Sequence, residues 1–232
     1  MLKYITYIII GASLSACSLF FEYKPKVSFV EINSATLDTT GLSFLSAYQD
    51  TIRQEFTKVI AQTPEPLLIA RPGSNLMNWC ADAVLRSQTA GVRLSEPVIC
   101  LLNTGGLRSS FGKGNLTLAD FYKLMPFDNR IVWVHLPVVK LKEIESYLIS
   151  SGGEPIANCT LQNKQLIIES LQSNHQYIWV LTTDFLANGG DQMTFFINEE
   201  KSETNVLLRD ILIEVAQAQQ ILQLDNKPRI DL

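Results

Sequence analysis

Apolar positions along the chain follow two spacings, which predict helices alternating with strands. Over residues 41–62 they recur every three or four positions, and this spacing is one face of a single helix. The same spacing predicts further helices over residues 75–89, 139–149 and 204–222. Ser74 or Asn75 is placed to cap the first of these helices, and Gly152-Gly153 is placed to end the second.

Continuous apolar runs of strand length lie between these helices. They cover residues 96–103, 129–136 and 175–185, and we expect the first of them to be buried on both faces. Residues 64–74 predict a shorter strand and a turn. Because helices and strands interleave, the fold class is α/β (α+β), a single layered domain of mixed β-sheet with packed helices. We place this domain at residues 40–232, after a tether and lead-in over residues 17–39.

Residues 1–16 have the pattern of an export signal. Lys3 precedes a short apolar run, which is well below the roughly 20 residues that cross a bilayer as a helix. The small residues directly before Cys17 resemble the lipobox of bacterial lipoproteins, which implies that Cys17 is lipidated. The alternative is an ordinary signal peptide followed by an incidental cysteine. We therefore expect an exported protein that is lipid-anchored to a bacterial membrane, in the periplasm or at the cell surface.

Composition excludes some classes of function. The formal net charge is −4 and Lys and Arg are not clustered, so we expect no nucleic-acid partner. Cys80 and Cys100 lie in apolar patterns that predict buried thiols. One disulfide among Cys80, Cys100 and Cys159 is possible, and the sequence does not decide whether it forms. With only His135 and His175 in the chain, neither a Cys/His metal cluster nor a catalytic histidine is expected.

The loop after the first apolar run reads "NTGGLR" and ends at Arg108. Paired glycines let a ligand approach the backbone, and the planar guanidinium suits phosphate or carboxylate. The loop lacks the spacing of a Walker loop and of a dinucleotide-binding fingerprint. By itself it favours an ordinary turn beside a surface arginine.

Two later loops add aromatic and polar groups. One carries Phe127 and Asn129, and the other carries Phe185 and Asp191. Each phenylalanine alone suggests core packing. Together, two rings can clamp a flat base, an amide can read its edge, a carboxylate can accept ribose hydroxyls and Arg108 can neutralise phosphate. The three loops therefore predict a site for a nucleoside or nucleotide.

Several stretches resemble the 5′-nucleotidase C-terminal domain family. "NTGGLRSSFGKGNLTLADFYKLMPFDNRIVWVHL" is similar to the N-x-G-G-[IL]-R signature and the P-F-x-N segment that follows it. "YIWVLTTDFLANGGDQMTFF" is similar to the family's later segment ending in G-G-D, "PGSNLMNWCADAVL" to its helix, and "KPRIDL" to its ending. The resemblance spans about residues 40–232 in the family's order, which implies the fold of this domain and its role in binding substrate.

The resemblance also implies a role for individual residues. It places Arg108 on phosphate or ribose oxygens, Phe127 and Phe185 on the two faces of the base, Asn129 on its edge and Asp191 on the ribose. Gly153, or Gly152 beside it, matches loosely a glycine that lines the site. Arg71 lies near a family arginine, although its register is shifted.

Full-length members of the family also carry a metallophosphoesterase domain with two metal ions, which this chain has neither the length nor the histidines to form. We therefore expect no catalytic residue, metal or cofactor in this chain. The resemblance implies the substrate-binding part of a split 5′-nucleotidase in nucleotide catabolism, with divalent metals in a separate metallophosphoesterase subunit. The alternatives are a non-catalytic nucleoside- or nucleotide-binding lipoprotein and a degenerate domain that has lost binding.

Overall fold

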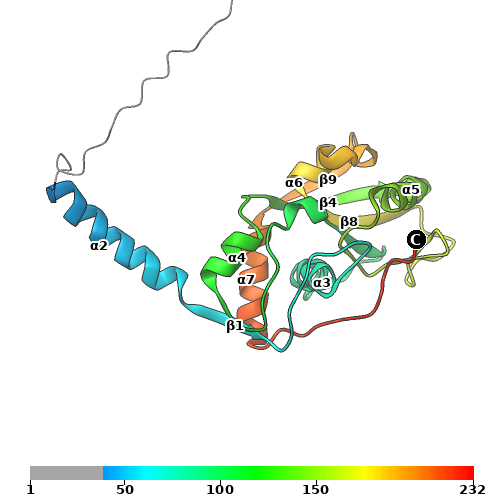
Figure 1. Cartoon of the computed structure of the whole chain (residues 1–232). Coiled ribbons are helices and arrows are strands. Elements are labelled where there is room, and N and C mark those ends of the chain that lie inside the picture. The colour runs from blue at the N-terminus through cyan, green and yellow to red at the C-terminus, as the bar shows by residue number, and fades with distance from the viewer. Residues whose placement is uncertain (1–38) are drawn as a thin grey trace, which may run out of the picture. The chain divides into compact units, whose positions relative to one another are not determined.

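The structure, a computed structural model, describes residues 39–232, with side chains from Tyr48 onward (Figure 1). The predicted signal peptide, the Cys17 lipidation site and nearly all of the predicted tether lie outside the described residues. The chain divides into two compact units, Met1–Ala47 and Tyr48–Leu232. The elements below belong to the second unit, apart from the first half of helix α2 (Thr39–Phe56).

A mixed sheet of five strands forms the centre of this unit, in the order β5-β2-β8-β4-β9. Its strands are β2 (Val98–Leu101), β4 (Arg130–Pro137), β5 (Ile156–Ala157), β8 (Tyr177–Thr183) and β9 (Glu200–Leu207). Strands β2 and β8 are parallel, and the other neighbouring pairs of the sheet are antiparallel. Strands β2, β4 and β8 lie where the apolar runs predict them, and the predicted mixed α/β architecture is confirmed.

Helices after α2 pack on both faces of this sheet. Besides α2, the α-helices of the described residues are α3 (Asn75–Thr89), α4 (Leu118–Leu124), α5 (Leu141–Ser151), α6 (Asp184–Ala187) and α7 (Leu208–Gln219). Short 3₁₀ turns are η3 (Thr104–Gly106), η4 (Val138–Lys140), η5 (Gly190–Gln192) and η6 (Thr194–Phe196). The predicted caps are confirmed, since the Ser74 side chain accepts the N–H of Met77 and Gly152 ends α5 in a left-handed conformation. No helix in the described part of the chain has the length and hydropathy needed to span a bilayer.

Two antiparallel ribbons lie outside the main sheet. Strand β1 (Val59–Thr63) pairs with β3 (Gly114–Thr117), and β6 (Thr160–Gln162) pairs with β7 (Gln165–Ile167). The prediction of one helix over residues 41–62 is therefore wrong at its end, because α2 stops at Phe56 and both Val59 and Ile60 belong to β1. These two β-branched residues suit a strand, and pairing with β3 decides their conformation.

Two other predicted elements are also shorter in the structure than the sequence indicates. The helix predicted over residues 204–222 begins only at Leu208, because the residues before it pair with β4 as part of β9. The strand predicted within residues 64–74 is reduced to one bridge, in which Leu67 and Phe111 exchange two backbone hydrogen bonds of 2.9 Å. In both places a contact distant in sequence overrides the local spacing.

Both faces of the sheet carry an apolar cluster, because successive strand residues point to opposite faces. On β2 and just after it, Cys100 and Leu102 join the cluster packed with α3 and α7, whereas Ile99 and Leu101 join the cluster packed with α5. Figure 1 shows α3 and α7 on one side of the sheet and α6 on the other. The expectation that β2 is buried on both faces is confirmed.

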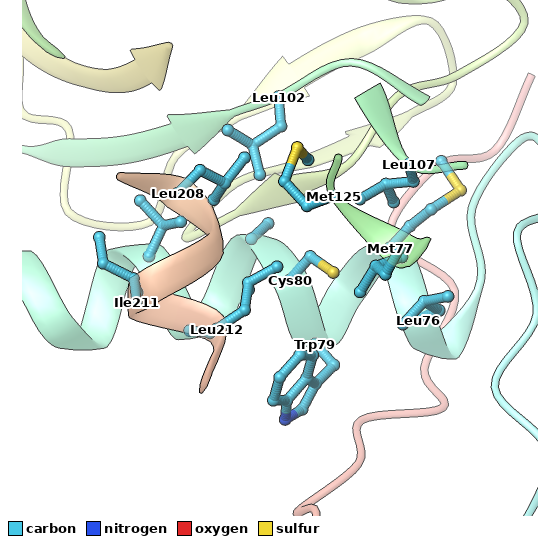
Figure 2. Close-up of a cluster of buried hydrophobic side chains, with 14 of the residues drawn as sticks. Leu76, Met77, Trp79, Cys80, Leu102, Leu107, Met125, Leu208, Ile211 and Leu212 are labelled. Atoms are coloured by element: carbon cyan, nitrogen blue, oxygen red, sulfur yellow. The ribbon is translucent and has the colours of Figure 1, made fainter. Parts of the chain in front are cut away.

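The cluster around α3 and α7 also anchors two loops at one end of the sheet. Figure 2 shows Leu107 and Met125 above α3, on the side of the helix that carries Met77 and Cys80. Leu107 is 4% exposed and Met125 is 1% exposed. Each of these buried side chains fixes the loop in which it lies.

The thiols are part of the core. Cys80, Cys100 and Cys159 are free and buried, which confirms the prediction for the first two. Burial raises the pKa of all three thiols, that of Cys159 to about 12. They are therefore protonated at neutral pH and act as small apolar side chains.

Arg229 holds the C-terminal segment against the rest of the unit. Its guanidinium donates two hydrogen bonds to Asp82 of 2.8 and 2.7 Å, one to Asp225 of 2.8 Å and one to the Ile156 carbonyl of 2.8 Å. The hydrogen bond from Arg229 holds the pKa of Asp225 below its ordinary value of 3.8. The charged form of Asp225 therefore stabilises the folded chain.

This shift predicts a loss of stability in acid. The pKa of Asp225 is lower in the folded than in the unfolded chain, so its contribution is complete above the unfolded pKa and is lost as pH falls through the folded pKa. Urea denaturation between about pH 5 and pH 2 should show a shallower decline of unfolding free energy in Asp225→Asn than in the wild type. Asp231→Asn, at an exposed residue of the same segment, is the control and should keep the wild-type slope. Equal slopes for Asp225→Asn and the wild type would contradict this role.

Candidate functional site

Three loops meet at the end of the sheet where β2 and β8 end and β4 begins. They enclose a cavity of about 280 Å³. Its lining residues are Asn103, Gly105, Gly106, Arg108, Phe127, Asn129, Phe185 and Asp191. The structure therefore brings together five of the six residues predicted from the sequence. Gly153 is not among the lining residues.

The first wall is the loop after β2. The buried carboxylate of Glu154 accepts the backbone N–H of Thr104 at 2.5 Å and a hydrogen bond from Arg71 at 2.6 Å. The Arg108 backbone N–H donates to the Leu124 carbonyl, and its guanidinium lies 5.5 Å from the centre of the Phe127 ring. Contacts outside the cavity therefore hold the backbone of this loop, whereas the Arg108 guanidinium lies at the cavity.

The second wall is the segment between α4 and β4. Phe127 is 39% exposed although its loop is anchored by buried Met125. The first residues of α7 bind this segment, since the Leu208 N–H donates to the Asn129 carbonyl at 2.9 Å and the Arg209 guanidinium donates to the Phe127 carbonyl at 3.4 Å. The aromatic ring and the Asn129 side chain thus lie at the cavity on a held backbone.

The third wall is helix α6 with the glycine turn that follows it. Phe185 is 48% exposed, and its helix is tied to the second wall because Asp184 accepts the Arg130 N–H at 3.2 Å. A side chain at Gly190 would place its Cβ 2.5 Å from the Phe185 ring. The glycine therefore lets the ring lie against the backbone of the turn.

Asp191 reaches the cavity from this turn in a left-handed conformation with φ of 49°. Its carboxylate accepts a hydrogen bond of 2.6 Å from the Asn103 side chain, which is 7% exposed. This bond joins the first and third walls. Asn103 was not predicted as a site residue, although it directly follows the apolar run of β2 and is the first residue of the "NTGGLR" loop.

Tyr147 of α5 lies in the same charged surroundings. Burial, with the carboxylates of Glu154 and Asp191, raises its pKa to about 12. Its hydroxyl, which is protonated at neutral pH even at the ordinary pKa of 10, therefore stays protonated in mildly alkaline solution as well.

Gly153 and Arg71 lie behind the first wall. Gly153 has φ of 101°, and a Cβ there would lie 2.0 Å from the Pro72 carbonyl oxygen. Arg71 binds Glu154 with a side chain that is 46% exposed. Arg71 thus supports the first wall through Glu154, whereas Gly153, next to Glu154 in the chain, packs against Pro72.

The groups at the cavity are suited to binding. Two half-exposed rings can hold a flat ligand, the carboxylate and amide can hydrogen-bond polar edges, and Arg108 can hold an anion. Within the described residues, no three His, Cys, Asp or Glu side chains form a group that could hold a metal ion. The described residues therefore provide no group of ligands for a two-metal centre.

Part of the sequence that forms these walls matches a known protein family. Residues 59–144 match the model of the family described as 5′-nucleotidase, C-terminal domain. The matched segment includes the first two walls and ends before Phe185 and Asp191 of the third.

Two curated proteins are similar over longer stretches. The chain is 29% identical over 154 residues to the trifunctional nucleotide phosphoesterase protein YfkN of Bacillus subtilis (strain 168), covering 56% of this chain and 10% of that protein. It is 22% identical over 225 residues to an apyrase of Tabanus yao, covering 80% of this chain and 40% of that protein. The chain thus spans less than half the length of either relative.

Solved structures share the fold. The crystal structure of a 5′-nucleotidase precursor from Thermus thermophilus matches with a TM-score of 0.63 and 20% identity, over 83% of this chain and 43% of that chain. At this identity the likeness concerns the fold alone. The mixed sheet with its packed helices therefore has the fold of the 5′-nucleotidase C-terminal domain, and residues 59–144 match the sequence of that family.

Proposed function

We propose that this chain binds the base and ribose of a nucleoside 5′-monophosphate and presents its phosphate to a metallophosphoesterase centre on a separate chain. The observation that carries the proposal is the convergence of two half-exposed phenylalanines, an amide, a carboxylate and an arginine at one cavity. The protein would act as the substrate-binding part of a split 5′-nucleotidase.

Each group has a role in this proposal. Phe127 and Phe185 stack on the base, and each contact between a base and an aromatic ring contributes about 1–3 kcal/mol. Asn129 hydrogen-bonds the base edge, Asp191 accepts the ribose hydroxyls and Arg108 holds the phosphate. The cavity of about 280 Å³ lies at the small end of ligand pockets, which favours one nucleoside unit over a longer ligand.

Hydrolysis is assigned to the partner on the chemistry of the reaction. Two-metal hydrolysis needs ligands that hold both ions and polarise a water. No group of described residues has the donors for a metal ion, so we place both ions on the partner. Lipidation of Cys17 and export are part of the same proposal, because they would hold the pair at a membrane surface.

Phosphate release from AMP tests this arrangement. The purified chain is assayed with a divalent metal, alone and with a candidate metallophosphoesterase chain. The split arrangement predicts little release by either chain alone and substantial release by the mixture. Substantial release by the purified chain alone would overturn the assignment of hydrolysis to a partner. AMP binding without any gain from the partner would instead support a nucleotide-binding lipoprotein.

Replacing Arg108 tests the placement of the phosphate. A charged hydrogen bond contributes about 1.5–3 kcal/mol, so Arg108→Gln should weaken AMP binding about 10-fold or more and leave adenosine binding nearly unchanged. Calorimetric titration measures both ligands. Lys113→Gln removes the same charge from an exposed position in the segment after Arg108 and should leave both affinities unchanged. An equal loss for AMP and adenosine would place Arg108 on the nucleoside instead.

A further inference from the structure

Arg209 is a buried charge on the face of α7 that packs into the core. Its side chain is 8% exposed, and it lies one helical turn before buried Leu212. A buried guanidinium is unfavourable unless polar groups surround it. The partners of Arg209 therefore indicate why this helix carries a charge in its apolar stripe.

These partners belong to the segment that carries Phe127. One guanidinium nitrogen donates to the carbonyls of Met125 at 3.2 Å and Phe127 at 3.4 Å, and the other donates to the Asp128 carboxylate at 2.7 Å. The guanidinium also lies 4.3 Å from the centre of the Tyr122 ring on α4. One side chain thus binds the backbone on both sides of Pro126.

We propose that Arg209 is a positioning residue, which holds the Phe127 ring in the orientation that stacks on the base. This inference rests on the proposed function and deepens it, since the affinity for the base then depends on a residue that does not line the cavity. The planar fork of Arg209 spans two carbonyls and a carboxylate at once. A lysine ammonium is a single point donor and does not reproduce this geometry.

The test compares a ligand that has a base with one that lacks it. In Arg209→Lys, AMP binding should weaken about 10-fold, whereas the affinity for ribose 5-phosphate should change less than about 2-fold. Asp128→Asn removes only the charge of the exposed partner, which is 78% exposed, and should weaken AMP binding about 2- to 3-fold without unfolding. Arg229→Lys is the matched control at a largely covered arginine of the C-terminal segment, which is 11% exposed, and it should leave both affinities unchanged.

A double-mutant cycle with Phe127→Ala tests whether Arg209 acts through the ring. If it does, Arg209→Lys adds no further loss of AMP affinity once the ring is absent. Additive losses, or equal losses for AMP and ribose 5-phosphate, would overturn the proposal.

Hydrogen exchange separates this inference from the proposed function. The amides of Met125 and Leu208, which donate to the carbonyls of Phe121 and Asn129, should exchange about 10-fold faster in Arg209→Lys than in the wild type or in Arg229→Lys. Unchanged exchange at these amides would overturn the positioning role whatever the ligand. A wild-type chain that binds no AMP, together with faster exchange in Arg209→Lys, would overturn the proposed function and leave Arg209 as the residue that holds this loop.

Discussion

Replacing both Phe127 and Phe185 by alanine should abolish measurable binding of AMP. Stacking on aromatic side chains contributes about 1–3 kcal/mol per ring, so the two losses amount to about 2–6 kcal/mol. This corresponds to a fall in affinity of about 30-fold to more than 10,000-fold. Each single variant should lose about 5- to 150-fold. The fold should be retained, because both rings are substantially exposed at 39% and 48%.

The shift in melting temperature on adding AMP measures this effect, since a ligand stabilises the folded chain by an amount that grows with the ratio of its concentration to its Kd. The shift should disappear in the double variant while the melting temperature without ligand stays nearly constant. Tyr177→Ala is a matched control, because its ring is also 39% exposed but lies at the opposite end of β8. Its ligand-induced shift should equal that of the wild type. A full shift in the double variant would contradict stacking by these rings.

Gly153→Ala should destabilise the folded chain by about 2–6 kcal/mol. A residue with a Cβ is strained at φ of 101°, which costs about 1–3 kcal/mol. The new Cβ would also meet the Pro72 carbonyl oxygen at 2.0 Å, and relieving such an overlap costs about 1–3 kcal/mol more. The helix end and the segment around Pro72 would have to separate.

Gly152→Ala is the neighbouring control for this prediction. Gly152 also has a left-handed φ, of 79°, but its nearest contact would be the Arg71 side chain at 3.7 Å. It should cost only about 1–2 kcal/mol in urea denaturation. If Gly153→Ala kept wild-type stability and lost only AMP affinity, Gly153 would be a ligand contact, as the family resemblance implies, and its packing role would be contradicted.

Long apolar segments made most of the sheet predictable from the sequence. Strands β2, β4 and β8 are buried apolar runs, and helices α3 and α5 have an apolar stripe with a recognisable end. Strand β9 was not predicted because its residues are mostly polar and are exposed or half-exposed, and β1 was not predicted because it is short and follows α2 closely. Val59 and Ile60 continue the spacing of α2, and only pairing with β3 identifies them as a strand.

The candidate site was predictable to a different extent. Arg108, Phe127 and Asp191 lie on glycine- and proline-rich loops next to apolar strands, where local sequence carries a signal. Glu154 and Arg209 support the site from other elements, and their partners are distant in sequence, so only the fold reveals them. For Arg209 the one local signal was a charge within the apolar stripe of a helix.

A crystal structure of the chain with AMP tests the central claim most directly. The predicted result is an adenine ring between Phe127 and Phe185, ribose hydroxyls on the Asp191 carboxylate and the phosphate at the Arg108 guanidinium. AMP bound elsewhere on the protein, or a cavity that stays empty at millimolar AMP, would contradict the claim.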